Sequence, residues 1–312
     1  MTAEADAVLE AAIREVRKAQ GHSDLAPLVE TFFDETTNTA THVVWDRATL
    51  KAAVVDSVLD FDLSSGKVST TSADRLLAHV ERQRLDVTWL LETHVHADHL
   101  TAAHYLRQRT GGRAAISREV IRVQQIFGDL FNLGDAVSAD GSAFDVLLDD
   151  GDRLAIGGLD AIALRAPGHT PADMAFVVGD SAFIGDTVFM PDSGTARTDF
   201  PGADAATLYR SIRRLLALPE ATKLRICRDY KASGRDVYQW ETTVQTQRRT
   251  NPHVRDGISE AAFVALRKAR DATLAVPRLI YPSLQVNIRA GRLPDPEPNG
   301  SRYLKLPLTG AI

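Results

Sequence analysis

The stretch THVHADHL, residues 93–100, carries three histidines and one aspartate within the six positions 94–99. The apolar run VTWLLE before it, residues 87–92, predicts a buried strand, and residues 100–109 after it predict a helix. The histidines therefore occupy a strand-to-helix loop, and loops at the carboxyl ends of strands are where open sheets carry their chemistry. Because zinc and iron accept imidazole nitrogen and carboxylate oxygen as ligands, the stretch predicts a metal site.

Two later segments offer further ligands. His169 lies in APGHT, residues 166–170, on a Pro-Gly turn, and Asp186 lies in IGDT, residues 184–187, where an apolar run ends. Taken alone, each has a simpler explanation, because a single histidine is more often an ordinary core or surface residue and Gly-Asp is a common turn. Their order after HxHxDH makes both of them ligand candidates.

The composition is that of an ordinary globular enzyme. The 312 residues are 44% hydrophobic and 25% charged, and the formal net charge is −5. A mildly acidic chain without a basic stripe leads us to expect neither a nucleic acid nor a membrane as a partner. The N-terminus lacks the pattern of a secretory signal, and Cys227 is the only cysteine. We therefore expect a cytoplasmic protein without intramolecular disulfides.

The chain divides into three expected parts. Residues 1–22 predict an N-terminal helical appendage, residues 23–250 the main domain, and residues 251–312 a C-terminal helical extension and tail packed on that same domain. Apolar runs at 40–44 and 52–55 predict strands of a first sheet, and the β-rich region 146–189 predicts a second sheet. We expect helices at 72–84, 204–217, 238–249 and 259–275, and an irregular proline-rich tail.

HxHxDH, a Pro-Gly-His-Thr turn and a Gly-Asp strand end form, in this order, the ligand set of the metallo-β-lactamase superfamily, which the sequence resembles from about residue 39 to 230. FMPDSGTARTDF, residues 189–200, and DYKASGRDVYQWETTVQTQRRTNPH, residues 229–253, resemble its persulfide dioxygenase branch and bacterial β-lactamase-like relatives. The resemblance implies an α+β fold, a four-layer αββα sandwich.

One position departs from the dinuclear pattern of the superfamily. Dinuclear hydrolases such as glyoxalase II fill a second metal site with the Asp and third His of HxHxDH, a bridging Asp and a late histidine. The late position here is Arg228, in Cys227-Arg228-Asp229-Tyr230. A guanidinium has no acceptor lone pair and repels a nearby cation, so the residue type disfavours a second metal.

The persulfide dioxygenase resemblance implies one Fe²⁺ per chain, held by His94, His169 and Asp186. It implies a low-molecular-weight persulfide such as glutathione persulfide and dioxygen as substrates, with sulfite and thiol as products. We expect the remaining polar residues of the motifs to surround the metal ligands, and we expect Arg228 to pair with Asp98 in place of a second ion. These surrounding residues are His96, Asp98, His99, Arg228 and Asp229.

Two residues are candidates for contacts with the substrate. Arg197, in GTARTDF, would hold a substrate carboxylate or support the loop at the iron, and an ion pair with Asp199 or Asp192 is an equally good explanation. Tyr230 matches the tyrosine of the family's His-Asp-Tyr and would donate a hydrogen bond near the oxygen site. A buried tyrosine with a satisfied hydroxyl is the alternative.

Three classes of function stay open. The first is the iron dioxygenase, and the second is a Zn²⁺ hydrolase of a thioester, lactone or other ester, which shares the fold and most ligands. The third is a binding or regulatory protein with a decayed site. Imidazole and carboxylate ligands suit zinc, manganese and iron alike, so the metal is open too. A homodimer through the N-terminal helix or the C-terminal tail is a further open alternative.

Overall fold

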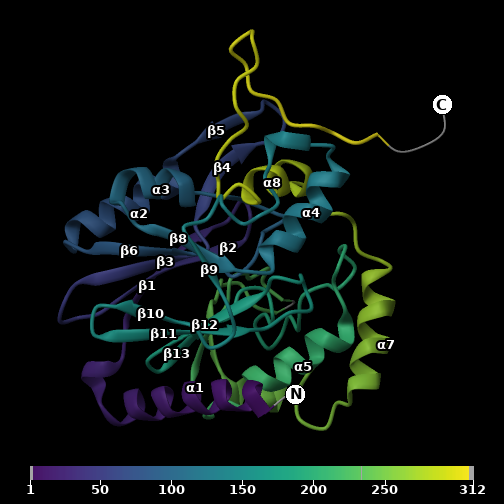
Figure 1. Cartoon of the computed structure of the whole chain (residues 1–312). Coiled ribbons are helices and arrows are strands. Elements are labelled where there is room, and N and C mark those ends of the chain that lie inside the picture. Colours follow the sequence, from purple (N-terminus) through teal and green to yellow (C-terminus); the bar gives the residue numbers. More distant parts are fainter. Residues whose placement is uncertain (1–2, 233, 309–312) are drawn as a thin grey trace.

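The structure is a computed structural model that describes residues 3–232 and 234–308. Two six-stranded sheets lie face to face and are covered by helices on both outer sides (Figure 1). This arrangement is the four-layer αββα sandwich that the sequence predicts. Within the described part of the chain, no helix is long and apolar enough to cross a membrane.

The first sheet has the order β1-β2-β3-β6-β8-β9. Its first two pairings are antiparallel, and the pairings from β3 to β9 are parallel, so the carboxyl ends of β3 and β6 lie side by side at one edge. That edge carries Asp56 after β3 and the histidine loop after β6. The strands are β1 (Leu28–Asp34), β2 (Thr39–Trp45), β3 (Lys51–Val55), β6 (Asp86–Leu91), β8 (Arg113–Ser117) and β9 (Val146–Leu148).

The second sheet has the order β10-β11-β12-β13-β14-β15. Only the β13–β14 pairing is parallel among these, and Asp186 and Arg228 follow these two strands closely. The strands are β10 (Arg153–Ile156), β11 (Leu159–Arg165), β12 (Met174–Val178), β13 (Ser181–Phe183), β14 (Lys223–Arg225) and β15 (Glu241–Thr243). A small third sheet joins β5 (Lys67–Ser69), β4 (Val58–Asp62) and β7 (Leu100–Thr101).

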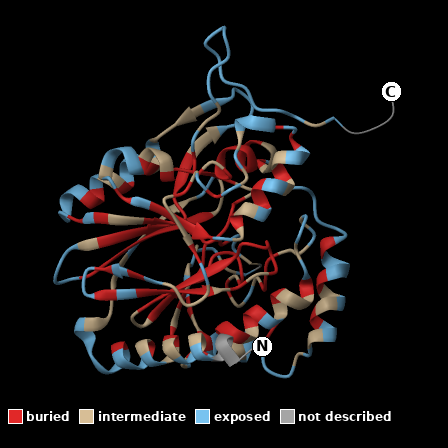
Figure 2. Cartoon of the chain, viewed as in Figure 1, coloured by how far each residue is buried: buried red, intermediate tan, exposed pale blue. Residues whose placement is uncertain are grey.

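Buried residues, red in Figure 2, are concentrated along both sheets. Their apolar members form clusters between the sheets and beneath each helical layer. The inter-sheet cluster joins residues such as Val55 and Leu91 to Phe176 and Phe183. The first sheet is covered by α2 (Thr71–Arg82), α3 (Ala103–Thr110), α4 (Val120–Leu130) and α8 (Ile280–Asn287), and the second by α1 (Ala3–Gly21), α5 (Ala205–Leu215), α6 (Val244–Thr250) and α7 (Glu260–Asp271). Two 3₁₀ turns span Ser23–Leu25 and Gly134–Ala136.

Three local predictions are wrong. Residues 146–148 form β9 of the first sheet and pair with β8, because a β-rich run does not reveal which sheet accepts it. Residues 241–243, predicted as helix, form β15, since pairing with β14 outweighs the helical pattern of the segment. The predicted irregular tail contains α8, whose last six residues are all buried, so it has no polar face for a periodicity search to detect.

The first and last helices of the described chain both pack on the body of the sandwich. Ala12 and Val16 of α1 are fully buried in the cluster under the second sheet. Val286 of α8 joins the cluster under the first sheet, and Leu284 joins the cluster around α4. Both chain ends therefore contribute to the outer layers.

Candidate metal centre

The three predicted ligands, far apart in sequence, meet in one place. His94 follows β6, His169 follows β11, and Asp186 follows β13; all three are buried. The Nε2 atoms of both histidines lie 3.8 Å from Oδ2 of Asp186. One ligand atom from each residue lies within 4.8 Å of the other two, which makes the group suitable for one metal ion.

A glycine lets the two sheets approach closely at this point. Gly185 has a φ of +53°, and a Cβ there would lie 2.5 Å from Oγ1 of Thr93. Residues with a side chain rarely adopt this conformation, and a side chain here would push the Asp186 segment away from the histidine loop. The Gly-Asp pair therefore brings the carboxylate to the imidazoles.

Neighbouring groups orient both imidazoles. Nδ1 of His169 donates to the carbonyl oxygen of Arg197 at 2.8 Å, which leaves the Nε2 lone pair directed toward Asp186. Nδ1 of His94 lies 3.0 Å from Oγ1 of Thr93. Asp56 accepts from the backbone N–H and the hydroxyl of Thr93, each at 2.8 Å. The ligand rings are thus held by hydrogen bonds that lie outside the ligand set.

Burial prepares the ligands for a cation. It lowers the pKa of His94 well below its usual value, so the ring is neutral and its nitrogen lone pair is free. Burial, with the nearby Asp56 and Asp173, raises the pKa of Asp186 well above its usual value, so its carboxylate form needs a positive charge beside it. Nε2 of His94 and Oδ1 of Asp186 are buried and have no hydrogen-bond partner among the described residues. Orphaned atoms of these types fit a metal ion.

Arg228 lies beside this group and is only 1% exposed. Its Nε donates to Oδ2 of Asp186 at 2.6 Å, and its Nη1 forms an ion pair with Asp98, the contact expected from the sequence. Nη1 also donates to Oγ1 of Thr39, and Nη2 lies 3.2 Å from Nδ1 of His96. The contact with Asp186 was not foreseen. It directs a fixed positive charge at a predicted metal ligand.

Those contacts tie Arg228 to the donors that a second metal would need. His96, Asp98 and His99 have ligand atoms within 4.8 Å of one another, and Asp98 lies 3.6 Å from Nδ1 of His99. Yet the guanidinium already pairs with Asp98 and faces His96. Burial lowers the pKa of His99 to about 4, so this ring adds no positive charge.

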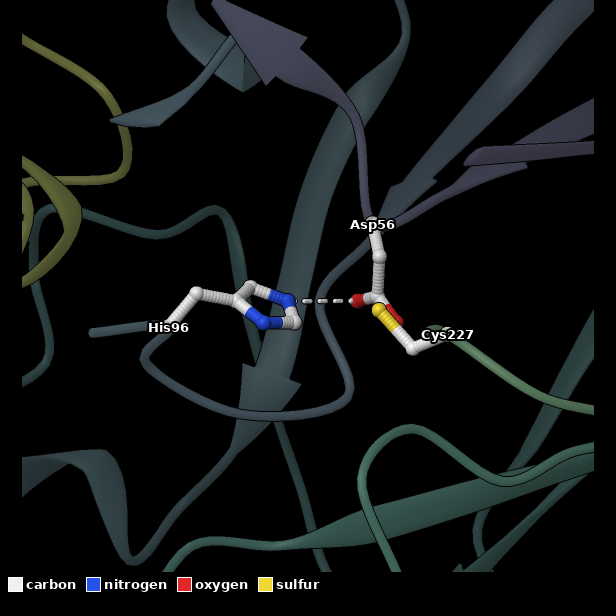
Figure 3. A group of neighbouring side chains, drawn as sticks. All are labelled: Asp56, His96 and Cys227. Atoms are coloured by element: carbon white, nitrogen blue, oxygen red, sulfur yellow. Dashed lines mark ion pairs between the residues drawn. The ribbon is translucent and has the colours of Figure 1, made fainter. Parts of the chain in front are cut away.

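A third group of possible ligands lies behind the histidine loop: Asp56, His96 and Cys227 (Figure 3). Nε2 of His96 lies 3.0 Å from Oδ1 of Asp56. Because an Arg228 N–H faces Nδ1 of the same ring, Nδ1 accepts and the proton lies on Nε2, toward Asp56. Burial and the neighbouring Asp56 raise the pKa of the Cys227 thiol well above its usual value. Although Nε2 of His96 has no hydrogen-bond partner among the described residues, Asp56 accepts two bonds from Thr93, so the group supports the start of the histidine loop.

A cavity of about 670 Å³ opens over His169 and Asp186. Arg197 lines it, but the Nε and Nη2 atoms of this side chain both donate to Asp199 at 2.6 Å, and Nη1 donates to the Ala275 carbonyl. Of the two explanations for Arg197, the structure shows the ion pair with Asp199. Tyr230 also lines the cavity; it is 51% exposed, and its hydroxyl has no hydrogen-bond partner in the described ranges.

Asp229 is not among the residues that line the cavity, and it organises the loop that follows it. It is fully buried, pairs with Arg235, and accepts from the backbone N–H of Gln239 at 2.7 Å. Arg235 also pairs with Asp192, which lies in the cavity wall. The residue therefore fixes the segment that carries Tyr230.

Three cavity-lining cations were missed by the sequence analysis: Lys231, Arg270 and Arg278. All three are exposed, and within residues 3–232 and 234–308 none of them has a carboxylate at ion-pair distance. The lining carboxylates already have arginine partners, since Asp98 and Asp186 pair with Arg228 and Asp192 pairs with Arg235. Lys231 lies about 40 positions before Arg270 and Arg278 in the sequence, so only the fold could reveal their shared cavity.

Residues 43–224 match the family model described as the metallo-beta-lactamase superfamily. The chain belongs to this superfamily. A protein of Burkholderia pseudomallei described as a probable metallo-hydrolase is 56% identical over 90% of this chain and 98% of its own length. The human mitochondrial persulfide dioxygenase ETHE1 is 28% identical over 92% of this chain and 97% of its own.

Solved structures agree on the fold of this superfamily member. The crystal structure of ETHE1 from Myxococcus xanthus matches with a TM-score of 0.68 and 29% identity, over 85% of this chain and all of that one. The chain spans 65% of the length of a 50% identical relative from Xylella fastidiosa, described as a beta-lactamase hydrolase-like protein. The comparisons thus include relatives described as hydrolases and as dioxygenases.

Proposed function

We propose that the chain is a mononuclear iron dioxygenase that oxidises a low-molecular-weight persulfide, of the glutathione persulfide type, to sulfite and thiol. The observation that carries the proposal is Arg228, which is buried against Asp98 and Asp186 where a dinuclear enzyme would need a further ligand. Likeness to the persulfide dioxygenases over more than nine tenths of the chain supports the reaction class.

His94, His169 and Asp186 would hold the iron. Two imidazoles and one carboxylate are the donor set of many non-haem Fe²⁺ oxygenases, and bound iron would supply the electron transfer that dioxygen chemistry requires. The protein contributes two imidazoles, held by Thr93 and the Arg197 carbonyl, and a carboxylate whose charge Arg228 balances. Overall, one persulfide, one dioxygen and one water give one thiol, one sulfite and two protons.

Cavity cations without carboxylate partners favour an anionic substrate, although the Lys231 ammonium also lies 4.0 Å from the centroid of the Tyr238 ring. Lys231, Arg270 and Arg278 line its wall without carboxylate partners among the described residues, in a chain whose net charge is −5. A peptide thiol persulfide carries carboxylates at the end away from its sulfur, and these would pair with the cations while the sulfur points to the metal ligands. The cavity volume of about 670 Å³ is in the usual range for such ligands.

A zinc hydrolase of a thioester, lactone or other ester is the second candidate. The 56% identity to a protein described as a probable metallo-hydrolase favours it. Arg228 counts against the dinuclear form of such a hydrolase, because its guanidinium offers no lone pair. We also propose a cytoplasmic location, since a reducing compartment suits a chain whose single cysteine is buried and free.

Purified protein should be tested for both reactions side by side. Oxygen uptake is measured with glutathione persulfide, and hydrolysis is measured with a glutathione thioester, on the same iron-loaded and zinc-loaded samples. We expect oxygen uptake and sulfite formation in the iron-loaded sample only. Thioester hydrolysis by the zinc-loaded sample, without oxygen uptake by the iron-loaded one, would favour the second candidate.

A further inference from the structure

Asn287, the last residue of α8, reaches into the histidine loop from the C-terminal extension. Its side-chain Nδ2 donates to the carbonyl oxygens of His96 and His99, each at 2.8 Å. Its Oδ1 accepts from the backbone N–H of Thr101 at 2.8 Å. The residue is 3% exposed, so water does not replace these bonds. One amide therefore satisfies three backbone groups of the histidine loop and the adjoining strand β7, about 190 positions earlier in the sequence.

The start of this loop is held by Asp56 and by backbone bonds at Glu92 and Thr93, but its second half has no such backbone–backbone bond among the described residues. Residues 92–99 lie between β6 and β7 and form neither helix nor strand. Buried carbonyls outside secondary structure must find a partner elsewhere. For His96 and His99 that partner is Asn287. The path of the backbone between His94 and Asp98 thus depends on a residue of the extension.

Packing holds Asn287 at the required distance. Leu284 and Ile288 share an apolar cluster with Val95, and Val286 shares another with Leu100. Beyond the helix, Gly291 has a φ of +84°, and a Cβ there would lie 2.7 Å from the carbonyl oxygen of Thr101. The C-terminal extension therefore packs against the histidine loop from both α8 and Gly291. Only a glycine at position 291 allows this close approach to Thr101.

We propose that Asn287 is a positioning residue for the metal centre, fixing the histidine loop so that His94 and Asp98 keep their places beside Asp186 and Arg228. The inference rests on the proposed metal ligands, and it is independent of which reaction the metal performs. Groups that hydrogen-bond a metal ligand typically change metal affinity by about 10–100-fold when removed, and Asn287 acts on the same loop one step away, through His96 and His99.

The test compares Asn287→Ala with Gln285→Ala, a matched control on the same helix. Gln285 is 2% exposed, its Nε2 donates to the Tyr281 and Lys305 carbonyls, and its Oε1 accepts from the Lys305 N–H. It thus makes the same number of hydrogen bonds, and none of them reaches the histidine loop. Both variants lose a buried amide, so a purely structural effect should be similar in the two.

Affinity for Co²⁺ and the visible spectrum of the bound ion are measured on the full chain by chelator competition. We expect Asn287→Ala to weaken binding about tenfold or more and to shift the cobalt spectrum, with Gln285→Ala within about twofold of the parent protein. Unchanged affinity and spectrum in Asn287→Ala, or equal weakening by both variants, would overturn the inference.

A second variant covers poor folding of Asn287→Ala. Asn287→Asp keeps the shape and the acceptor for Thr101, but directs an oxygen at the two carbonyls, and we expect it to weaken Co²⁺ binding as well. Normal binding by this variant would also overturn the inference. Because cobalt affinity is the readout, a parent protein that binds metal but does not oxidise persulfide would refute the proposed reaction and leave this inference standing.

Discussion

At the scale of single residues, the metal centre depends on how buried charges are balanced. Asp186 is a fully buried carboxyl whose pKa is raised well above its usual value, and Asp98 lies on the other side of the same guanidinium. Arg228 supplies one positive charge between them. A single metal ion on His94, His169 and Asp186 would supply the rest. The same charge would repel a second ion.

Replacing Arg228 with histidine should restore a second metal site. The variant Arg228→His removes the cation and returns a nitrogen lone pair next to Asp98 and His99. We expect metal content, measured by elemental analysis after loading with zinc, to rise from about one to about two ions per chain. Arg225→His is the control, because Arg225 ends β14 three positions before Arg228 and pairs with Glu241. A content that stays near one would contradict the role given to Arg228.

Removing a cavity cation should weaken substrate binding and leave chemistry intact. Arg270→Ala and Arg278→Ala each remove one exposed charge. Its attraction for the substrate is worth about 0.5–1 kcal/mol, so KM for glutathione persulfide should rise roughly two- to fivefold, with kcat little changed. The effect should shrink at high salt. Arg249→Ala, an exposed arginine on α6 away from the cavity wall, is the control. Unchanged KM in both variants would remove the case for an anionic substrate.

At the scale of elements, the sequence predicts those strands, loops and turns that have a periodic apolar pattern or belong to an ordered motif. β6, the histidine loop and the turns at His169 and Asp186 were all predicted, because each combines an apolar run with a recognisable end. α8 was missed because burial on all sides leaves no polar stripe. Lys231, Arg270 and Arg278 were missed because their shared cavity forms only when the extension folds back over the sheets.

The contact between His42 of β2 and Ile226, just after β14, should make the free energy of unfolding depend on pH. His42 of β2 is fully buried, with Nε2 3.0 Å from the carbonyl oxygen of Ile226, and burial lowers its pKa to about 4. Since this folded-state pKa lies below the unfolded value, the contribution of neutral His42 is complete above pH 6.5 and is lost as pH falls toward 4.

Urea unfolding at pH 7 and pH 5 measures this dependence. Between pH 7 and pH 5, the free energy of unfolding of the parent protein should fall by on the order of 2 kcal/mol more than that of His42→Gln. The reason is that one unit of pKa shift corresponds to about 1.4 kcal/mol. Equal losses in parent and variant would show that His42 does not carry this part of the acid sensitivity.

At the scale of the whole molecule, the metal ligands come from both sheets, so binding should stabilise the fold. His94 follows a strand of the first sheet, and His169 and Asp186 follow strands of the second. At a metal concentration about 100 times Kd the gain is about 2.7 kcal/mol. Removing the metal with a chelator should therefore lower Tm by roughly 5 °C or more. His169→Ala should show no such shift, and an equal shift in this variant would place the stabilising ion elsewhere.

The number and identity of the bound ions test the proposal of a single iron site most directly. Anomalous scattering from crystals of the protein as purified, recorded at the iron and zinc absorption edges, measures both together. The account predicts one iron peak between His94, His169 and Asp186, with the Arg228 side chain beside it. Two fully occupied zinc peaks, the second among His96, Asp98 and His99, would contradict it.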